Sequence, residues 1–442
     1  MRRFRLPKVD PKNVPAYIRG GFKSLGNEYG RMRGTNIWTF IMYGLLFDMT
    51  NNLWRPFAAK FLERLGGAEF HFSLLSSLPG LVGAIVLLPG AVLLRKFTNK
   101  KRATAAFILT SRFMLLALAS VPLLPAELRP LLFIIFVATL NCPEALSQTS
   151  LQSLLGTVFN GSTRGQAIAL RTKFGQAIIP IVTISSGLII TFAPNTDEQR
   201  MFLYQLFFLG AFFLGLVEVY IFNKLKVQEA TDGQNSGAKN GNTPPLRQLA
   251  LIFKDKRFIK FFIPAICFAF TWQAGWPLFN IFQIRVLQST ELWFAIFALM
   301  SGTSALMSGG FWQRVLRKHG NNTTFVISAG VLALNAIIIP FVPNVQVMAL
   351  FSVVGGFSAI GINTSMLNGV LEATPDENRI MYLAYYNTAI NISLFVAPIF
   401  SAFLLMATNI TWALVIIGLM RFGGMAFIWL SHKFNPAAVD VN

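Results

Sequence analysis

Residues 138–180 read ATLNCPEALSQTSLQSLLGTVFNGSTRGQAIALRTKFGQAIIP, and this stretch decides the fold. Its first part is apolar but carries polar side chains at intervals of 3, 4 and 4 residues, namely Asn141, Glu144, Gln148 and Gln152. These intervals place the four side chains on one face of a helix. A polar turn at 160–162 follows, and a second apolar segment then begins with Arg171 and Lys173. The stretch predicts two long apolar helices, the first with a polar stripe.

A weaker copy of this stretch occupies residues 361–398 and reads GINTSMLNGVLEATPDENRIMYLAYYNTAINISLFVAP. At an offset of 220 residues, the same intervals separate Gly361, Thr364, Asn368 and Glu372. A polar turn and Arg379 follow, as in the first copy. A polar stripe on an apolar helix, present twice, indicates a duplicated membrane protein with a water-accessible interior.

The composition of the whole chain favours the same class. Of 442 residues, 54% are hydrophobic and 13% are charged, whereas a soluble domain carries about 25% charged residues. The apolar residues form continuous runs of about 20, long enough to cross a bilayer as helices. A β-barrel would instead show alternating polar and apolar residues. The composition therefore predicts a helical membrane protein with many spans.

The basic residues predict membrane orientation and give no reason to expect a nucleic-acid partner. The net charge is +20, but Lys and Arg cluster in loops between apolar runs, as the bias toward the cytoplasmic side requires. Two cysteines and three scattered histidines form no metal-ligand pattern. The chain shows no phosphate-binding glycine loop and no nucleophile–base set. We therefore expect no metal, no cofactor and no enzymatic activity.

Twelve spans follow from the apolar runs, and we place them at 36–60, 70–94, 103–124, 130–156, 170–192, 201–223, 259–284, 292–315, 323–342, 345–371, 383–407 and 410–431. The expected division is a basic N-terminal arm (1–35), a six-helix bundle (36–223), a hydrophilic linker (224–258), a second six-helix bundle (259–431) and a short tail (432–442). Lys and Arg follow spans two and eight, whereas the loops after spans nine and eleven carry neither. The arm, the linker and the tail are thus expected in the cytoplasm.

The loop between the second and third spans resembles the signature of the major facilitator superfamily. That signature has the form Gly-x-Leu-Ala-Asp-Arg-x-Gly-Arg-Arg, and here Gly90 and Arg95 precede the basic cluster Lys100, Lys101 and Arg102. Leu94 stands where the family usually has Asp. The corresponding loop of the second half contains Gly310 and Arg314, and the pair Arg164 and Gly165 after the fourth span also looks like a family feature.

This resemblance covers nearly the whole chain after the N-terminal arm. It implies an all-α integral membrane protein with twelve transmembrane helices in two six-helix halves, each built from three-helix repeats. It also implies that spans 1, 4, 7 and 10 line a central cavity. The polar residues of those spans and of span 3 are the candidate substrate or proton sites: Asp48, Asn52, Arg55, Arg112, Asn141, Glu144, Gln148, Gln273, Trp276, Asn280, Thr364 and Asn368. The gating-loop candidates are Gly90, Arg95, Arg164, Gly165, Gly310 and Arg314.

Ionisable residues inside spans are costly in a bilayer and are therefore functional candidates. Asp48 is expected to be a proton site or a substrate-cation site, or else to form a structural hydrogen bond to a neighbouring helix. Glu144 follows Pro143, which allows a kink, so it is expected to act at a moving gate or else to be a satisfied acid beside a tolerated proline. We expect the two acids to line one cavity and at least one of them to exchange a proton. Arg112, in the middle of span 3, is a candidate partner for either acid, and Arg55 is a candidate to hold an anionic substrate. Arg421 is a further basic residue inside a span, for which ion pairing within the bundle is one expectation. Glu218 is expected near the cytoplasmic end of span 6, where it either snorkels toward the membrane surface or pairs with a basic loop.

Together these features predict a secondary active transporter that moves a small solute by alternating access, coupled to protons. The alternative is a transport-inactive membrane sensor or scaffold that retains the fold. We expect a monomer in the cell (inner) membrane, with an unidentified small-molecule substrate and the lipid bilayer as partners.

Overall fold

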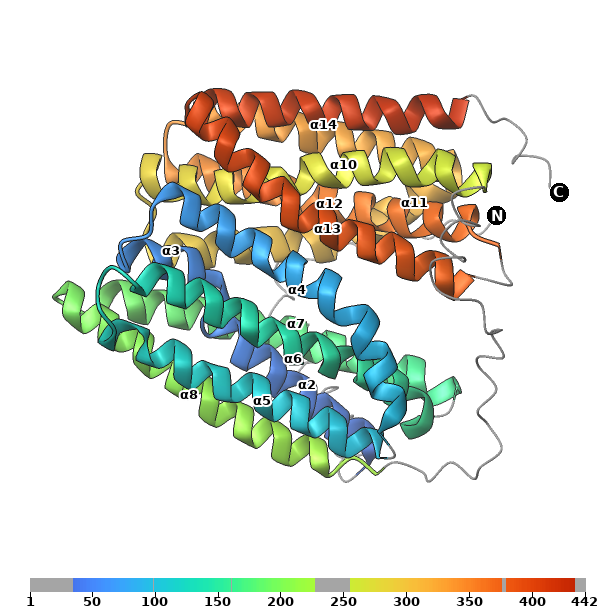
Figure 1. Ribbon diagram of the computed structural model, residues 1–442. Coiled ribbons are helices and arrows are strands. Elements are labelled where there is room, and N and C mark those ends of the chain that lie inside the picture. The colour runs from blue at the N-terminus through green and yellow to red at the C-terminus, as the bar shows by residue number, and fades with distance from the viewer. Residues whose placement is uncertain (1–34, 98, 160, 227–254, 376–378, 434–442) are drawn as a thin grey trace, which may run out of the picture.

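The protein is helical throughout the part that the computed structural model describes, which comprises residues 35–97, 99–159, 161–226, 255–375 and 379–433 (Figure 1). Within these described residues, ten helices are long and apolar enough to cross a membrane. Many large apolar side chains point outward, among them Leu123, Phe192, Met307 and Met406. Such a surface suits lipid and would be unstable in water.

The helices form two groups that are separated in the sequence by the linker. The N-terminal half contains α2 (Asn36–Asn52), η2 (Arg55–Phe57), α3 (Ala58–Arg64), α4 (Glu69–Lys96), α5 (Lys100–Ser120), η3 (Val121–Leu123), α6 (Arg129–Val158), α7 (Gly161–Phe192) and α8 (Asp197–Asn223). The C-terminal half contains α10 (Lys256–Ile281), η4 (Phe282–Val286), α11 (Glu291–Ile338), η5 (Ile339–Phe341), α12 (Val345–Ala373), α13 (Arg379–Ala407) and α14 (Ile410–Lys433).

Two of these elements differ from the uninterrupted spans predicted by the sequence. The first span is broken after Asn52, because Trp54 leaves the helical conformation (φ −131°) and Pro56 has no backbone N–H to continue the ladder. Conversely, α11 contains both the eighth and the ninth span, which meet at Gly320 (φ 79°) without an intervening loop. A positive φ is readily adopted only by glycine. With α2–η2–α3 counted as one crossing and α11 as two, the described residues are compatible with the twelve crossings that were expected.

The two ends of the bundle can be distinguished by the chain connections (Figure 1). The start of α2, the end of α8, the start of α10 and the end of α14 all lie on the right of the view, and we call this the linker end. The connections α3–α4, α7–α8 and η4–α11 lie at the opposite end, which we call the far end. The N-terminal arm, most of the linker and most of the tail lie outside the described residues, so their predicted boundaries stay predictions.

Contacts between the halves run mainly through α4 with α13 and α7 with α11. Gly80 and Gly83 of α4 face Asn391, and a methyl group at either glycine would collide with it. Near the far end, Gly187 of α7 packs against Ala295 of α11 in the same way. Small residues at these crossings let the backbones approach closely, which is how helices associate in lipid.

Candidate functional site

Asp48 forms an ion pair with Arg171, whose Nη2 lies 2.9 Å from Asp48 Oδ1. Asp48 is 7% exposed in the middle of the first span. The facing helices make room for both side chains, since Arg171 lies over Gly44 of α2 and Asp48 lies over Gly175 of α7. Arg171 was seen in the sequence only as the start of a helix. Arg112, the predicted partner of Asp48, makes other contacts.

Arg112 pairs with Glu218, and the two side chains are the most deeply buried ion pair in this half. Arg112 Nε and Nη2 donate to the two carboxylate oxygens of Glu218 at 2.9 and 3.2 Å, and both residues are at most 1% exposed. The aliphatic part of Arg112 packs against Gly215, one turn from Glu218. The prediction that Glu218 pairs with a basic loop is therefore wrong. The position of Glu218 near the end of its helix suggested a loop partner, but the position alone does not specify which neighbouring helix the side chain faces.

Glu144 bridges this pair to the first span. Arg55 Nη2 donates to Glu144 Oε2 at 2.7 Å, and Arg112 Nη1 lies 4.0 Å from the same oxygen. The Arg55 side chain is 37% exposed, whereas that of Glu144 is 11% exposed. The guanidinium group of Arg55 therefore already binds a carboxylate of the protein, although the sequence predicted it as a contact for an anionic substrate.

The interior of the N-terminal half contains three carboxylates and three guanidinium groups among its described residues. Asp48, Glu144 and Glu218 are balanced by Arg55, Arg112 and Arg171. The ring of Phe47 lies between two of the cations, 5.5 Å from Arg112 and 5.9 Å from Arg171. The phenol oxygen of Tyr43 is buried beside this cluster without a hydrogen-bond partner. The cluster is therefore close to electrically neutral.

The predicted amides of the same half satisfy part of their hydrogen bonding within their own helices. Asn52 Nδ2 donates to the carbonyl of Asp48 at 2.8 Å, and Asn141 Nδ2 donates to the carbonyl of Val137 at 2.7 Å. Gln148 is half-buried on α6. The polar stripe on α6 is therefore only partly free to bind a solute.

In the C-terminal half, Gln273 links α10 to α13. Its Oε1 accepts from Ser393 Oγ at 2.7 Å, and its Nε2 donates to the carbonyl of Ile390 at 3.4 Å. Thr364 and Asn368 are half-buried on α12. Both Trp276, which is 41% exposed, and Asn280 line cavities.

Two neighbouring cavities open around Trp276. One, of about 510 Å³, lies between the halves, where Leu75, Ser76 and Pro79 of α4 face Asn280 of α10 and Leu394 of α13. We call it the inter-half cavity. The other, of about 280 Å³, lies among the helices of the C-terminal half and is lined by residues of α10, α11, α12 and α14. We call it the C-half cavity. Trp276 and Phe279 belong to both linings.

The gating-loop candidates lie in the end turns of α4 and α7 and in the part of α11 that precedes its kink at Gly320. Arg164 and Gly165 are exposed in the first turns of α7, and Gly310 and Arg314 are exposed on α11. Nothing lies within 4 Å of a methyl group built on Gly165 or Gly310, so neither glycine is required by close packing here. Gly90 and Arg95 belong to the last turns of α4, and the surroundings of both lie outside the described part of the structure.

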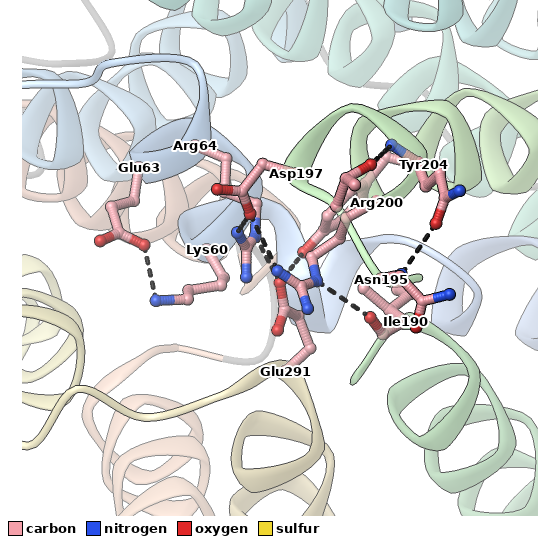
Figure 2. A network of polar contacts seen from close by, with 11 residues as sticks. Lys60, Glu63, Arg64, Ile190, Asn195, Asp197, Arg200, Tyr204 and Glu291 are labelled. Atoms are coloured by element: carbon pink, nitrogen blue, oxygen red, sulfur yellow. Dashed lines mark hydrogen bonds and ion pairs between the residues drawn. The ribbon is translucent and has the colours of Figure 1, made fainter. Parts of the chain in front are cut away.

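A polar network that the sequence reasoning missed joins the halves at the far end (Figure 2). Arg64 Nε of α3 lies 2.6 Å from Glu291 Oε1 of α11, and Tyr204 of α8 donates to the same oxygen at 3.2 Å. Asp197 accepts from Arg64 and Arg200 at 3.1 and 2.9 Å. Glu291 is 1% exposed although it is the first residue of its helix. Both Arg64 and Glu291 fall just outside the predicted spans, and no periodic pattern marked them.

Two further hydrogen bonds cross between the halves at the same end. Arg285 Nη2 donates to the carbonyl of Gly67 at 3.0 Å, and the backbone N–H of Leu292 donates to Thr191 Oγ1 at 3.0 Å. Together with the Arg64–Glu291 pair, they hold α3 and the end of α7 against η4 and the start of α11. We call these contacts the far-end latch. They join the two halves at the far end.

The fold and these contacts define a multi-pass α-helical membrane protein of two six-helix halves, with a cavity between them. The chain belongs to the Major Facilitator Superfamily, whose sequence profile matches residues 38–366 and 287–440. This family consists of membrane transporters and not of enzymes. A search of curated proteins found no significant match.

Several solved transporter structures share the fold. The crystal structure of a mutant of the nucleoside transporter NupG aligns with a TM-score of 0.70 at 16% identity, covering 89% of this chain and 100% of that one. The inward-open xylose transporter XylE from E. coli aligns with a TM-score of 0.66 at 13% identity, covering 89% and 95%. A bacterial homologue of the human lysosomal transporter Spinster, inward-facing and unoccupied, gives 0.65 at 11% identity, covering 90% and 96%.

Proposed function

We propose that this protein is a secondary active transporter that moves a small organic solute by alternating access, with proton coupling. The observation that carries the proposal is the inter-half cavity, because α4 lines one side of it and α10 and α13 line the other. A site shared by two rigid halves is exposed to one face of the membrane and then the other as the halves rock. In this proposal, the far-end latch is formed in the state that is closed at the far end and broken in the state that is open there.

The proposed orientation follows from the charge bias of the loops. The linker end faces the cytoplasm, both termini are cytoplasmic, and the protein acts as a monomer in the cell (inner) membrane. The far end then faces outward, and the latched state is inward-facing. The inward-facing states in which the XylE and Spinster-homologue structures were solved support this assignment.

Alternating access is tested by measuring distances at both ends of the bundle. Spin labels at Ala68 and Gln288 report on the far end, and labels at Arg102 and Lys318 report on the linker end, since all four positions are exposed. The background lacks Cys142 and Cys267. In nanodiscs, Glu291→Gln is expected to raise the far-end-open population at least tenfold, because it removes a buried carboxylate that binds Arg64 in the closed state only.

The two label pairs must respond in opposite directions. As the far end opens, the distance at the linker end should shorten by the same population shift. The matched control is Glu63→Gln, because Glu63 pairs with Lys60 inside the N-terminal half and does not cross to the other half. Distances that stay fixed at both ends, or that lengthen together, would contradict alternating access and favour the sensor or scaffold.

Proton coupling is assigned to Asp48 and Glu144, whose cation partners sit on different helices from their own. A carboxylate whose contact with its cation changes between two states can bind a proton in one and release it in the other. Asp48→Asn and Glu144→Gln keep the shape but cannot titrate. One of them should abolish accumulation against a gradient in proteoliposomes while leaving exchange intact. Unchanged accumulation and pH dependence in both variants would remove these two acids as the coupling site.

A further inference from the structure

Arg421 is a fully buried cation whose described contacts include no carboxylate. It lies in the middle of α14 and is 1% exposed. Its Nε, Nη1 and Nη2 donate to the carbonyls of Thr271, Leu332 and Trp272 at 3.3, 3.4 and 3.0 Å. Its guanidinium packs against Gly275 and lies 5.3 Å from the ring centroid of Phe279.

The described part of the surrounding half contains no carboxylate at this depth. Within residues 255–375 and 379–433, the carboxylates are Asp255, Glu291 and Glu372, and each lies at or near a helix end. Asp255 accepts from Tyr382, and Glu291 pairs with Arg64. An unpaired charge in the middle of a membrane bundle is costly and marks a binding site or ion pathway.

Arg421 is part of the wall of the C-half cavity, and the same wall contains a buried hydrogen-bond acceptor that has no donor. Asn335 is 6% exposed, and its Nδ2 donates to the carbonyl of Phe351 at 3.2 Å, but its Oδ1 accepts no hydrogen bond. A buried acceptor without a donor costs free energy. Arg421 contacts the carbonyl of Leu332, and Asn335 lies one helical turn from Leu332. Arg421 and Asn335 therefore share one side of the cavity.

The remaining wall is aromatic and apolar. Trp272, Trp276, Phe297 and Phe351 contribute rings, while Gln283 and Ser301 add polar atoms. Ligand sites are typically apolar with a few placed polar groups that fix orientation. Trp276 and Phe279 also line the inter-half cavity, so the C-half cavity borders the proposed transport path.

We propose that the C-half cavity binds the carboxylate of an organic monoanion that carries a hydroxyl or amine donor and an apolar or aromatic body. Three of the five N–H donors of Arg421 are used by carbonyls, which leaves one on each terminal nitrogen for the two oxygens of a carboxylate. A monoanion neutralises the single charge, whereas a phosphate dianion would leave an excess negative charge inside the bundle. The donor of the ligand would meet Asn335 Oδ1. The inference rests on the proposed function, since it names the substrate class of that transporter.

The test compares carboxylates with their uncharged amides on the purified full-length protein in nanodiscs. The probes are benzoate and benzamide, and 4-hydroxybenzoate and 4-hydroxybenzamide, each at concentrations up to tens of millimolar. Binding is measured by the shift in melting temperature, because a ligand that binds only the folded state raises it by mass action. At least one carboxylate should bind at least tenfold more tightly than its amide. Equal responses within every pair, or no response to any carboxylate, would overturn the proposal.

Two variants locate the site. Arg421→Gln should lose at least tenfold in affinity for the carboxylate and leave the affinity for the amide unchanged. Asn335→Leu should reduce the advantage of 4-hydroxybenzoate over benzoate while keeping the preference for charge, and it remains informative if Arg421→Gln does not fold. The matched control is Arg257→Gln, because Arg257 is exposed at the start of α10. Wild-type preference in both cavity variants would place the anion elsewhere.

This binding experiment does not depend on transport. A protein that selects carboxylates but shows no reciprocal distance changes would lose the proposed function and keep this site. A protein that alternates between states but does not distinguish a carboxylate from its amide would keep the proposed function and lose this site.

Discussion

The two halves of this protein differ in the groups that contact their buried arginines. In the N-terminal half, Arg112 is held by both oxygens of Glu218, and Arg171 is held by Asp48. In the C-terminal half, the described contacts of Arg421 are carbonyls and a ring. The first arrangement is complete without a ligand, since positive and negative charges cancel. The second leaves a positive charge beside a cavity, which an anion from outside can balance.

The largest expected effect comes from replacing the two fully buried arginines by methionine. Arg112→Met leaves Glu218 buried without a cation and should lower the free energy of unfolding by about 3–5 kcal/mol. Arg421→Met removes a charge without stranding an acid, so its effect should stay within about 1 kcal/mol of the wild type. Equilibrium unfolding in detergent–lipid micelles measures both, and the double variant Arg112→Met, Glu218→Met should recover most of the loss. Equal losses for the two single variants would make Arg421 a structural residue.

A smaller effect is expected from replacing the glycines that pack against Arg171 and Arg421. A methyl group at Gly44 would come within 2.5 Å of Arg171 Cγ, and one at Gly275 would collide with the guanidinium of Arg421. Gly44→Ala should cost about 1–3 kcal/mol of unfolding free energy, as overpacking does. Gly275→Ala should instead weaken carboxylate binding at least fivefold with a smaller loss of stability.

The matched control for both is Gly423→Ala on α14, where no atom lies within 4 Å of the new methyl group. It should leave both unfolding and carboxylate binding at wild-type values, apart from the small gain that alanine brings to a helix. If Gly275→Ala binds carboxylates as the wild type does, the guanidinium of Arg421 does not contact the ligand.

The smallest effect concerns the exposed side of the far-end latch. The Asp197 side chain is 85% exposed, whereas that of Glu291 is 1% exposed, although both bind Arg64. Exposed ion pairs contribute about 0–1 kcal/mol, so Asp197→Asn should change the far-end-open population less than threefold. Glu291→Gln should change it at least tenfold. Spin-label distances on the same pair of positions compare the two, and similar shifts would mean that burial of Glu291 adds nothing to the latch.

The sequence alone determined the class and the plan of the protein, because hydrophobic run length and polar periodicity are local properties. The twelve crossings, the division into halves and the prominence of Asp48, Glu144 and Arg112 are all legible in it. The spacing of two glycines was a further indication that the sequence analysis did not use. Gly44 precedes Asp48 by four residues, and Gly175 follows Arg171 by four. In the structure each charge lies over the glycine of the facing helix.

Only the tertiary structure decided which charges meet. Partners depend on the rotation and depth of each helix, and periodicity within one helix does not specify its angle to a neighbour. For this reason Asp48 meets Arg171, Arg55 meets Glu144, and Glu218 faces inward toward Arg112. The latch joins Arg64 to Glu291 across 227 positions of the chain. The three carbonyls that Arg421 contacts, on α10 and α11, are likewise decided by the packing of the bundle.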